Sequence, residues 1–222
     1  MDSHNVRRQW AERSGEFSPA YYAYYGPNET SDVLLHILEE SIDKSAPVLE
    51  LGCSCGRHLA HLRDHGFDTL AGIDLNEDAF DVMAEHYPDL AASGEFYSEA
   101  IEDVVGGFED DRFAAVYSVE TLQHVHPDAE WVFDELSRIA ADLLVTVENE
   151  GDLDAGRPSD ADASSGFGGE REEPADPQVS YVNDEFPLYH RDWRAIFTDR
   201  GFVEVASTSS RKDTVRTFRS TS

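Results

Sequence analysis

The sequence has 222 residues, and its 46 Asp and Glu residues against 17 Lys and Arg residues give a formal net charge of −29. A chain of this length folds as one domain or slightly more, and its 12 Phe, 9 Tyr and 3 Trp exclude a charge-driven disordered protein. Contacts with nucleic-acid phosphates need clustered Lys and Arg, and the sequence contains no such cluster, so we expect no nucleic-acid partner.

The acidic residues are spread along the whole chain, and 15 of the 17 basic residues are Arg. This composition resembles that of halophilic, haloarchaeal-type proteins, in which surface carboxylates bind water and cations while molar salt screens their repulsion. A site for basic partners such as histone tails is the alternative, but such sites usually gather their acids in a tail. We therefore interpret the charge as an adaptation to salt.

Cysteine chemistry and export are not indicated. Cys53 and Cys55 are too close for an ordinary structural disulfide and have no further Cys or His at zinc spacing, so we expect no metal. The first ten residues lack the apolar segment of a signal peptide, and no apolar run approaches the roughly 18 residues of a membrane span. We expect a cytoplasmic protein without a membrane partner.

Residues 1–45 are predicted to form a helical, aromatic segment ahead of a main domain. Tyrosines gather at 21–25, and a helix with Leu34 and Leu38 on one face opens at Ser31. The tyrosines either fold over a ligand as a lid or pack as the core of an N-terminal helix.

Short apolar segments alternate with helical patterns at the start of the main domain, which spans residues 46–222. Asn76 is predicted to cap one of these helices. Strands that alternate with helices form a parallel sheet, because each crossover places a helix on a face of the sheet. The predicted strands are 47–51, 70–73, 95–98, 113–118 and 143–147.

The alternation of strands and helices is interrupted after residue 150. Residues 151–178, rich in Gly, Asp, Ser and Pro, are predicted to be a flexible acidic insertion. Trp193 and Phe197 mark a helix, and strands at 202–207 and 214–218 form an antiparallel hairpin. The predicted fold is α/β and Rossmann-like, with a seven-stranded, mostly parallel sheet, helices on both faces and a C-terminal antiparallel hairpin.

A glycine loop with the sequence E-L-G-C-S-C-G at 50–56 follows the first strand, and Asp74 ends the second. Small residues let the backbone turn sharply and approach a ligand, and the next helix offers free N–H groups. A carboxylate at the neighbouring strand end suits a ribose diol, whose two hydroxyls can both donate to it. Together these features predict a nucleoside pocket.

The spacing of the loop distinguishes between cofactors. A dinucleotide loop reads G-x-G-x-x-G, but here Ser54 and His58 stand where further glycines would be needed. An NAD-dependent oxidoreductase is kept as an alternative, although with only Lys44 and Lys212 the Tyr-x-x-x-Lys pair is missing. The pattern E-x-G-x-x-x-G with an acid 18 residues beyond the last glycine resembles motifs I and II of the class I S-adenosylmethionine-dependent methyltransferases.

The resemblance continues along the chain, over roughly residues 30–150 and 186–219. Residues 98–101 are similar to the family's adenine-contacting turn, 112–125 to the fourth-strand segment beside the transferring methyl group, and 201–205 to its penultimate strand. The sequence departs from the family at Ser54, which replaces a glycine, and at Ala114 or Ala115, which replace an acid. These substitutes are small, so the loop keeps the low bulk that it needs.

The resemblance implies a methyltransferase that uses S-adenosyl-L-methionine, with a small-molecule acceptor favoured by the short lid and the missing basic surface. A cofactor-binding regulator without turnover is a further alternative. Oligomeric state is not indicated. The implied cofactor-binding residues lie at strand ends and in the turns after them: Glu50, Gly52, Cys53, Ser54, Gly56, Asp74, Leu75, Glu99, Ala100, Ile101 and Ser118.

Glu120 and His124 are the predicted catalytic residues. A His has a pKa near neutral and can take a proton from a hydroxyl, amine or acid acceptor. His124 is equally well explained as a residue that packs or hydrogen-bonds at the strand–helix junction. Glu148 and Glu150 end the fifth strand and either line the acceptor pocket or are solvated. Cys53 is interpreted as a small loop residue and not as a nucleophile.

The net charge of −29 predicts a salt-dependent fold. Lowering KCl from molar to millimolar concentration removes the screening of the surface carboxylates, so the melting temperature should fall. Thermal unfolding followed by circular dichroism over a KCl series measures this. A melting temperature that does not change with KCl would contradict the interpretation.

Overall fold

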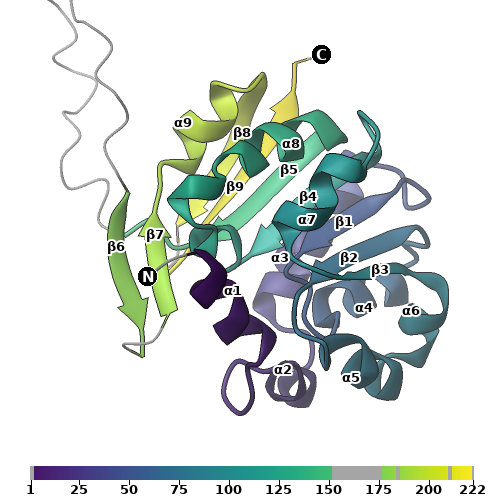
Figure 1. Cartoon of the computed structure of the whole chain (residues 1–222). Coiled ribbons are helices and arrows are strands. Elements are labelled where there is room, and N and C mark those ends of the chain that lie inside the picture. The colour runs from purple at the N-terminus through teal and green to yellow at the C-terminus, as the bar shows by residue number, and fades with distance from the viewer. Residues whose placement is uncertain (1–2, 152–176, 184–185, 210–211, 222) are drawn as a thin grey trace, which may run out of the picture.

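The computed structural model describes residues 3–151, 177–183, 186–209 and 212–221 (Figure 1). The predicted acidic insertion at 151–178 lies almost entirely outside the described residues. A seven-stranded sheet with the order β3-β2-β1-β4-β5-β9-β8 forms the centre of the molecule. Its strands are β1 (Val48–Leu51), β2 (Leu70–Asp74), β3 (Glu95–Ser98), β4 (Phe113–Val119), β5 (Ala140–Glu148), β8 (Phe202–Ser209) and β9 (Thr214–Ser220).

The pairing of the strands confirms the predicted sheet. The five strands from β3 to β5 pair in parallel, whereas β9 pairs antiparallel with both β5 and β8. Leu51 at the end of β1 is in register with Ile73 of β2 and Ser118 of β4. The central parallel strands therefore end at one edge of the sheet.

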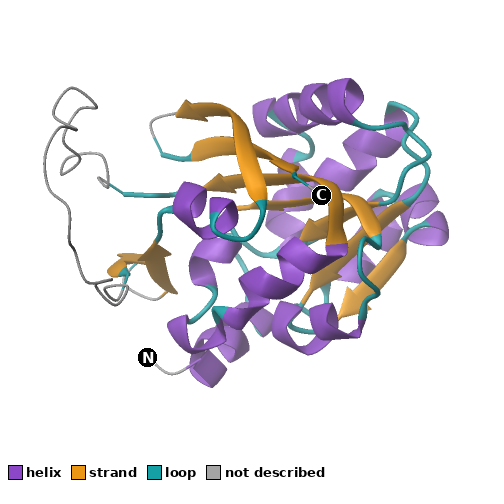
Figure 2. Ribbon diagram, turned by 90° about the horizontal axis from the view of Figure 1, so that it is seen from above, coloured by secondary structure: helices purple, strands orange, loops and turns teal. Residues whose placement is uncertain are grey.

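Helices cover both faces of the sheet, as predicted (Figure 2). Among the described residues, no helix combines the length and the apolar character of a membrane span. The α-helices are α1 (Ser3–Ala11), α2 (Pro19–Tyr25), α3 (Glu29–Ser41), α4 (Arg57–Asp64), α5 (Ala79–His86), α6 (Pro88–Ser93), α7 (Ile101–Val104), α8 (Trp131–Ile139) and α9 (Trp193–Thr198). Three short 3-10 helices are η1 (Val105–Gly107), η2 (Leu122–His124) and η3 (Pro127–Ala129).

Two apolar cores lie on opposite faces of the sheet, because successive strand side chains alternate between the faces. On β1, Leu49 and Leu51 belong to one core and Val48 to the other. Trp193 and Phe197 of α9 are fully buried in the first core. The predicted helix at this position is thus fixed by its aromatic face.

The start of α3 differs from the prediction by a few residues. The helix begins at Glu29 and not at Ser31. Asn28 is the cap, and its side chain accepts from the backbone of Ser31 while the Ser31 hydroxyl accepts from the Asn28 N–H. This reciprocal capping box places Ser31 inside the first turn.

Asn76 does not cap α5, which begins at Ala79. Its side-chain amide instead donates to the carbonyl oxygens of Trp10 and Arg13 at 3.2 and 3.1 Å. Its Oδ1 also accepts from the Asp78 N–H at 3.0 Å, so the residue has a local role as well as a tertiary one. It joins the end of α1 to the turn after β2.

A second, two-stranded antiparallel sheet of β6 (Gln178–Val182) and β7 (Phe186–His190) is absent from the prediction. Pro187 argues against a strand, because proline has no N–H for a central ladder. Both strands of this sheet are edges, however, and an edge tolerates proline. The Phe186 ring packs on Trp10 with centroids 4.3 Å apart, so the hairpin also contacts α1.

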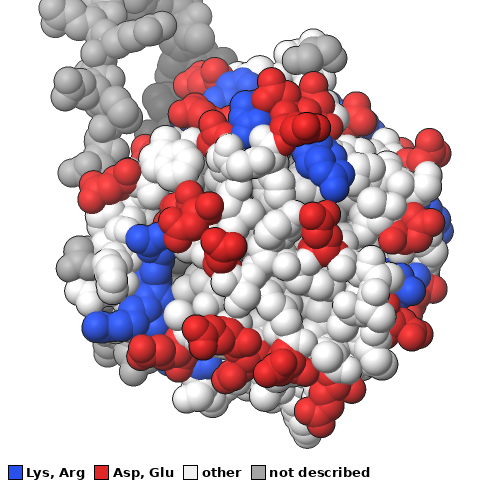
Figure 3. Space-filling view, turned by 45° about the vertical axis from the view of Figure 1, so that its right-hand side comes forward, with Lys and Arg blue, Asp and Glu red and all other residues white. Residues whose placement is uncertain are grey.

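Acidic side chains are scattered over the face of the molecule shown in Figure 3, among fewer basic ones. The excess of carboxylates gives most of the arginines that the structure describes a partner. Ion pairs with Asp or Glu are formed by Arg7, Arg112, Arg138, Arg191, Arg194, Arg200 and Arg216.

Candidate active site

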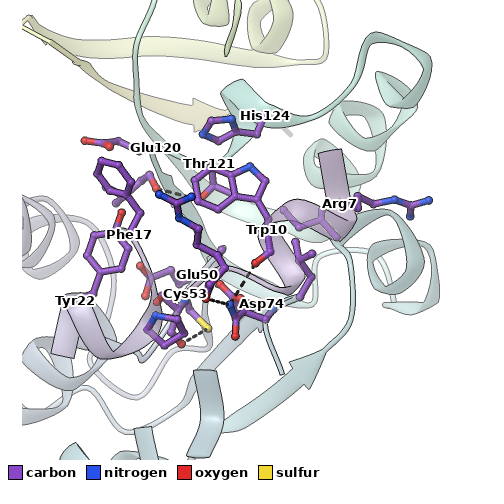
Figure 4. A pocket seen from close by; sticks show the side chains of 18 of the residues that line it. Arg7, Trp10, Phe17, Tyr22, Glu50, Cys53, Asp74, Glu120, Thr121 and His124 are labelled. Atoms are coloured by element: carbon purple, nitrogen blue, oxygen red, sulfur yellow. Dashed lines mark hydrogen bonds between the residues drawn. The ribbon is translucent and has the colours of Figure 1, made fainter. Parts of the chain in front are cut away.

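A cavity of about 150 Å³ lies at the edge where β1, β2 and β4 end, and the α1–α2 segment covers it (Figure 4). Glu50 and Asp74 lie at one end of the cavity, and Glu120 and His124 lie at the other. Nine predicted site residues line it: Glu50, Gly52, Cys53, Ser54, Asp74, Leu75, Ile101, Glu120 and His124.

The glycine loop has a backbone that depends on its small residues. Gly52 has φ +66°, and a Cβ on it would lie 2.2 Å from the Thr121 hydroxyl oxygen. Gly56 has φ +74°, and its Cβ would lie 2.7 Å from the Met83 methyl group. Gly56 does not line the cavity, but it sets the start of α4. Ser54 is also left-handed, with φ 48°, which is uncommon for a residue with a side chain.

Asp74 holds this loop from the neighbouring strand. Its two carboxylate oxygens accept from the backbone N–H groups of Ser54 and Asn76, both at 2.8 Å. Burial raises the pKa of Asp74, and the two hydrogen bonds oppose that shift. A carboxylate oxygen has more than one acceptor site, so Asp74 can also receive hydroxyl donors from a ligand.

Glu50 is only 1% exposed. The Tyr117 hydroxyl donates to its Oε2 at 3.1 Å, which supplies the partner that a buried carboxyl group requires. Burial raises the pKa of Glu50 to about 8, although Tyr117 and the nearby Arg57 charge oppose the shift. Glu50 is therefore mostly protonated at neutral pH.

Glu120 directly follows β4 and has φ 48°. Lys212, in the turn between β8 and β9, donates its Nζ to both carboxylate oxygens at 2.9 Å. The C-terminal hairpin thus places a positive charge beside the cavity. Burial and the Glu120 charge raise the pKa of the neighbouring Asp213 to about 6.

His124 has a defined tautomer. Its Nδ1 lies 2.9 Å from the Pro187 carbonyl oxygen, and because a carbonyl only accepts, Nδ1 carries the hydrogen. Nε2 therefore keeps its lone pair. Burial lowers the pKa of His124 to about 4, so the ring is neutral at pH 7. The ring also packs on Trp10 with centroids 4.7 Å apart, so the residue both packs and lines the cavity.

Ser118 and Glu148 lie outside the cavity and bind one another. The Ser118 hydroxyl donates to Oε1 of the fully buried Glu148 at 2.5 Å. Glu148 also accepts from the backbone N–H groups of Thr121, Leu122 and Gln123 at 3.0–3.3 Å. Burial raises the pKa of Glu148 to about 7, against these hydrogen bonds. Glu148 thus fixes the turn that carries the catalytic candidates.

The remaining predicted residues lie near the cavity without lining it. Glu99 is exposed, and Ala100 is buried at the start of α7, where Glu102 contributes to the lining. Glu150 neither lines the cavity nor stands free in solvent, because it forms a bidentate ion pair with Arg216 at 2.6 and 2.7 Å.

The cysteines are free thiols. Burial raises the pKa of Cys53 and raises that of Cys55 to about 11. A thiol in such a place is a poor nucleophile. Among the residues that the structure describes, no group of three or more His, Cys, Asp or Glu is arranged to hold a metal ion.

Several residues that line the cavity were not predicted from the sequence. Val6, Trp10 and Arg13 of the N-terminal segment face the cavity, and their spacing of four and three residues is a helical signal. Tyr22 lines the cavity, whereas Tyr24 is 83% exposed and fills neither of the two expected roles. Further lining residues are Arg57 and His58, at the start of α4.

Known proteins share this architecture. A 1,6-didemethyltoxoflavin-N1-methyltransferase from Burkholderia thailandensis, with bound 1,6-didemethyltoxoflavin and S-adenosylhomocysteine, superposes with a TM-score of 0.62 at 15% identity, covering 87% of this chain and 78% of that one. The magnesium protoporphyrin IX methyltransferase from Synechocystis PCC 6803, with bound S-adenosylhomocysteine, superposes with a TM-score of 0.65 at 14% identity. The match covers 99% of this chain and 100% of that one. A putative methyltransferase in complex with the Haloferax volcanii Trm112 methyltransferase activator has a TM-score of 0.61 at 14% identity, covering 86% of this chain and 87% of that one.

No curated protein sequence matches the chain. The family described as "Methyltransferase domain" matches residues 48–142, which run from β1 into β5 and contain the glycine loop, Asp74 and the turn after β4. With this domain on this fold, the chain is an S-adenosylmethionine-dependent methyltransferase.

Proposed function

We propose that this methyltransferase acts on a small molecule bound between the turn after β4 and the α1–α2 segment. The observation that carries the proposal is the cavity itself, with a carboxylate for a ribose at one end and the Nε2 lone pair of His124 at the other. The methyltransferase domain decides against the NAD-dependent oxidoreductase.

The lining residues fit S-adenosylmethionine. Asp74 keeps acceptor capacity for the ribose hydroxyls, and Cys53 and Ser54 line the cavity together with it. Leu75 and Ile101 offer an apolar surface for the adenine ring. We also keep Gly52, Gly56, Glu99, Ala100 and Ser118 as proposed members of the cofactor site, with the last four acting from outside the lining.

The cofactor, when bound, supplies a methyl group that its sulfonium already activates. The protein must then align the acceptor and exclude water. Trp10 and Phe17 lie on opposite sides of the cavity in Figure 4, where they shield its interior. We propose that His124 accepts the proton of the acceptor at Nε2, and that Glu120 positions the acceptor from its place beside Lys212.

A small acceptor is supported by the cover over the cavity. Asn76 joins the covering α1 to the turn after β2, so residues 1–45 include a lid over the site. The Burkholderia thailandensis enzyme of the same fold holds the small molecule 1,6-didemethyltoxoflavin. We further propose a salt-adapted, haloarchaeal-type protein, on the basis of the −29 net charge.

Asp74→Ala should weaken binding of S-adenosylhomocysteine by about 1–3 kcal/mol if this carboxylate receives the ribose hydroxyls. Calorimetry in molar KCl measures the affinity. Asp78→Ala is the matched control, because Asp78 is exposed, does not line the cavity and makes no side-chain capping bond. An unchanged affinity in Asp74→Ala would remove the assignment.

His124→Phe should reduce methyl transfer by about 10²- to 10⁴-fold, since the ring loses its proton acceptor but keeps its aromatic contact with Trp10. The acceptor is first found by incubating metabolite pools with labelled S-adenosylmethionine. Cofactor affinity should stay unchanged. Equal rates in the wild type and the variant would exclude His124 as the base. Cofactor binding by the wild type without methyl transfer to any acceptor would favour the alternative of a cofactor-binding regulator.

Glu50→Gln should remove a pH dependence of stability. Folding raises the pKa of Glu50 from its ordinary value to about 8. The contribution of Glu50 to the free energy of unfolding is therefore complete below that ordinary value and is lost as the pH rises through about 8. A glutamine can still accept from Tyr117 and does not ionise. Denaturant unfolding between pH 5 and 9 should show that the variant becomes more stable relative to the wild type as the pH rises. Parallel curves of unfolding free energy against pH for the two proteins would contradict this.

A further inference from the structure

Arg57 has an unusual situation for a basic residue in this acidic protein. It is the first residue of α4, directly after the glycine loop, and its half-buried side chain lines the cavity. Within the described parts of the chain, its guanidinium makes no ion pair and no hydrogen bond, although acids outnumber basic residues by 46 to 17. Its donors are therefore uncommitted inside the site.

The orientation of Arg57 is nevertheless fixed. Its guanidinium lies over the ring of Tyr22, 4.6 Å from the centroid, and Tyr22 belongs to the α2 part of the lid. A guanidinium held on an aromatic face keeps its N–H groups in the plane of the fork, where they can meet a planar anion. The other central guanidinium of the cavity, that of Arg13, already donates its Nε to the Glu16 carbonyl oxygen and lies over Phe186.

The buried Glu50, whose pKa the Arg57 charge lowers, does not neutralise Arg57. Glu50 uses its carboxyl group to accept from Tyr117, and burial keeps it mostly protonated at neutral pH. The guanidinium of Arg57 therefore keeps its positive charge beside Glu50, although the Asp74 carboxylate lies at the same end of the cavity. An anionic group of a ligand is stabilised there.

We propose that Arg57 binds the carboxylate of the amino-acid end of S-adenosylmethionine, through the paired N–H groups of its guanidinium. The assignment rests on the proposed function, and it follows from chemistry: the cofactor has one anionic group, a planar carboxylate that matches the guanidinium fork. Asp74, at the end of the adjacent strand, would repel that carboxylate and suits the ribose. Arg57 and Asp74 thus set the direction in which the cofactor lies.

The test compares S-adenosylmethionine with decarboxylated S-adenosylmethionine, which differs only in lacking the carboxylate. Calorimetry in molar KCl should show that the wild type binds S-adenosylmethionine about 10- to 100-fold more tightly than the decarboxylated form. Arg57→Gln should lose this preference by weakening S-adenosylmethionine alone. Arg57→Lys keeps the charge but not the fork, so it should retain part of the preference.

Arg63→Gln is the control, because Arg63 lies on the same helix, is also half-buried and does not line the cavity. It should bind both ligands as the wild type does, and thermal unfolding without ligand verifies that each variant is folded. Equal weakening of both ligands in Arg57→Gln would overturn the assignment, and so would no weakening of either. A wild type that binds neither ligand would refute the proposed function itself.

Discussion

The position of β1 between β2 and β4 is the constraint on which the site depends. Both neighbours are parallel to β1, so the chain leaves β1 toward one side of the sheet and later returns on the other. Where the direction of winding changes, the connections separate and leave a crevice at the carboxyl ends of the strands. The glycine loop, the end of β2 and the turn after β4 all meet there.

Buried carboxyl groups stabilise the edges of this crevice. Glu148 receives three backbone N–H groups and the Ser118 hydroxyl, so the turn after β4 is attached to the end of β5. A buried carboxylate without such donors would cost several kcal/mol. In a protein whose surface acids repel one another, Glu148 and Glu50 have a different role, because each is satisfied by donors from a neighbouring strand or turn.

The sequence predicts those parts that local patterns determine. Local sequence predicts four of these features, because a buried strand needs consecutive apolar residues and a tight turn needs small ones. They are the apolar runs of β1 and β5, the glycine loop and Asp74. The β6–β7 hairpin and the lining role of Trp10 depend on contacts between distant segments, which no local pattern records. Glu148 shows the same limit: a strand-end acid is visible in sequence, but its turn partners are known only from the fold.

The join between α1 and the turn after β2 has a consequence for the order of folding. Asn76 meets the carbonyl oxygens of Trp10 and Arg13 across 66 and 63 residues, and Phe186 meets Trp10 only near the end of the chain. During synthesis the N-terminal segment leaves the ribosome before any of its docking partners. The α1 segment therefore reaches its final position only after Asn76 and Phe186 have been made.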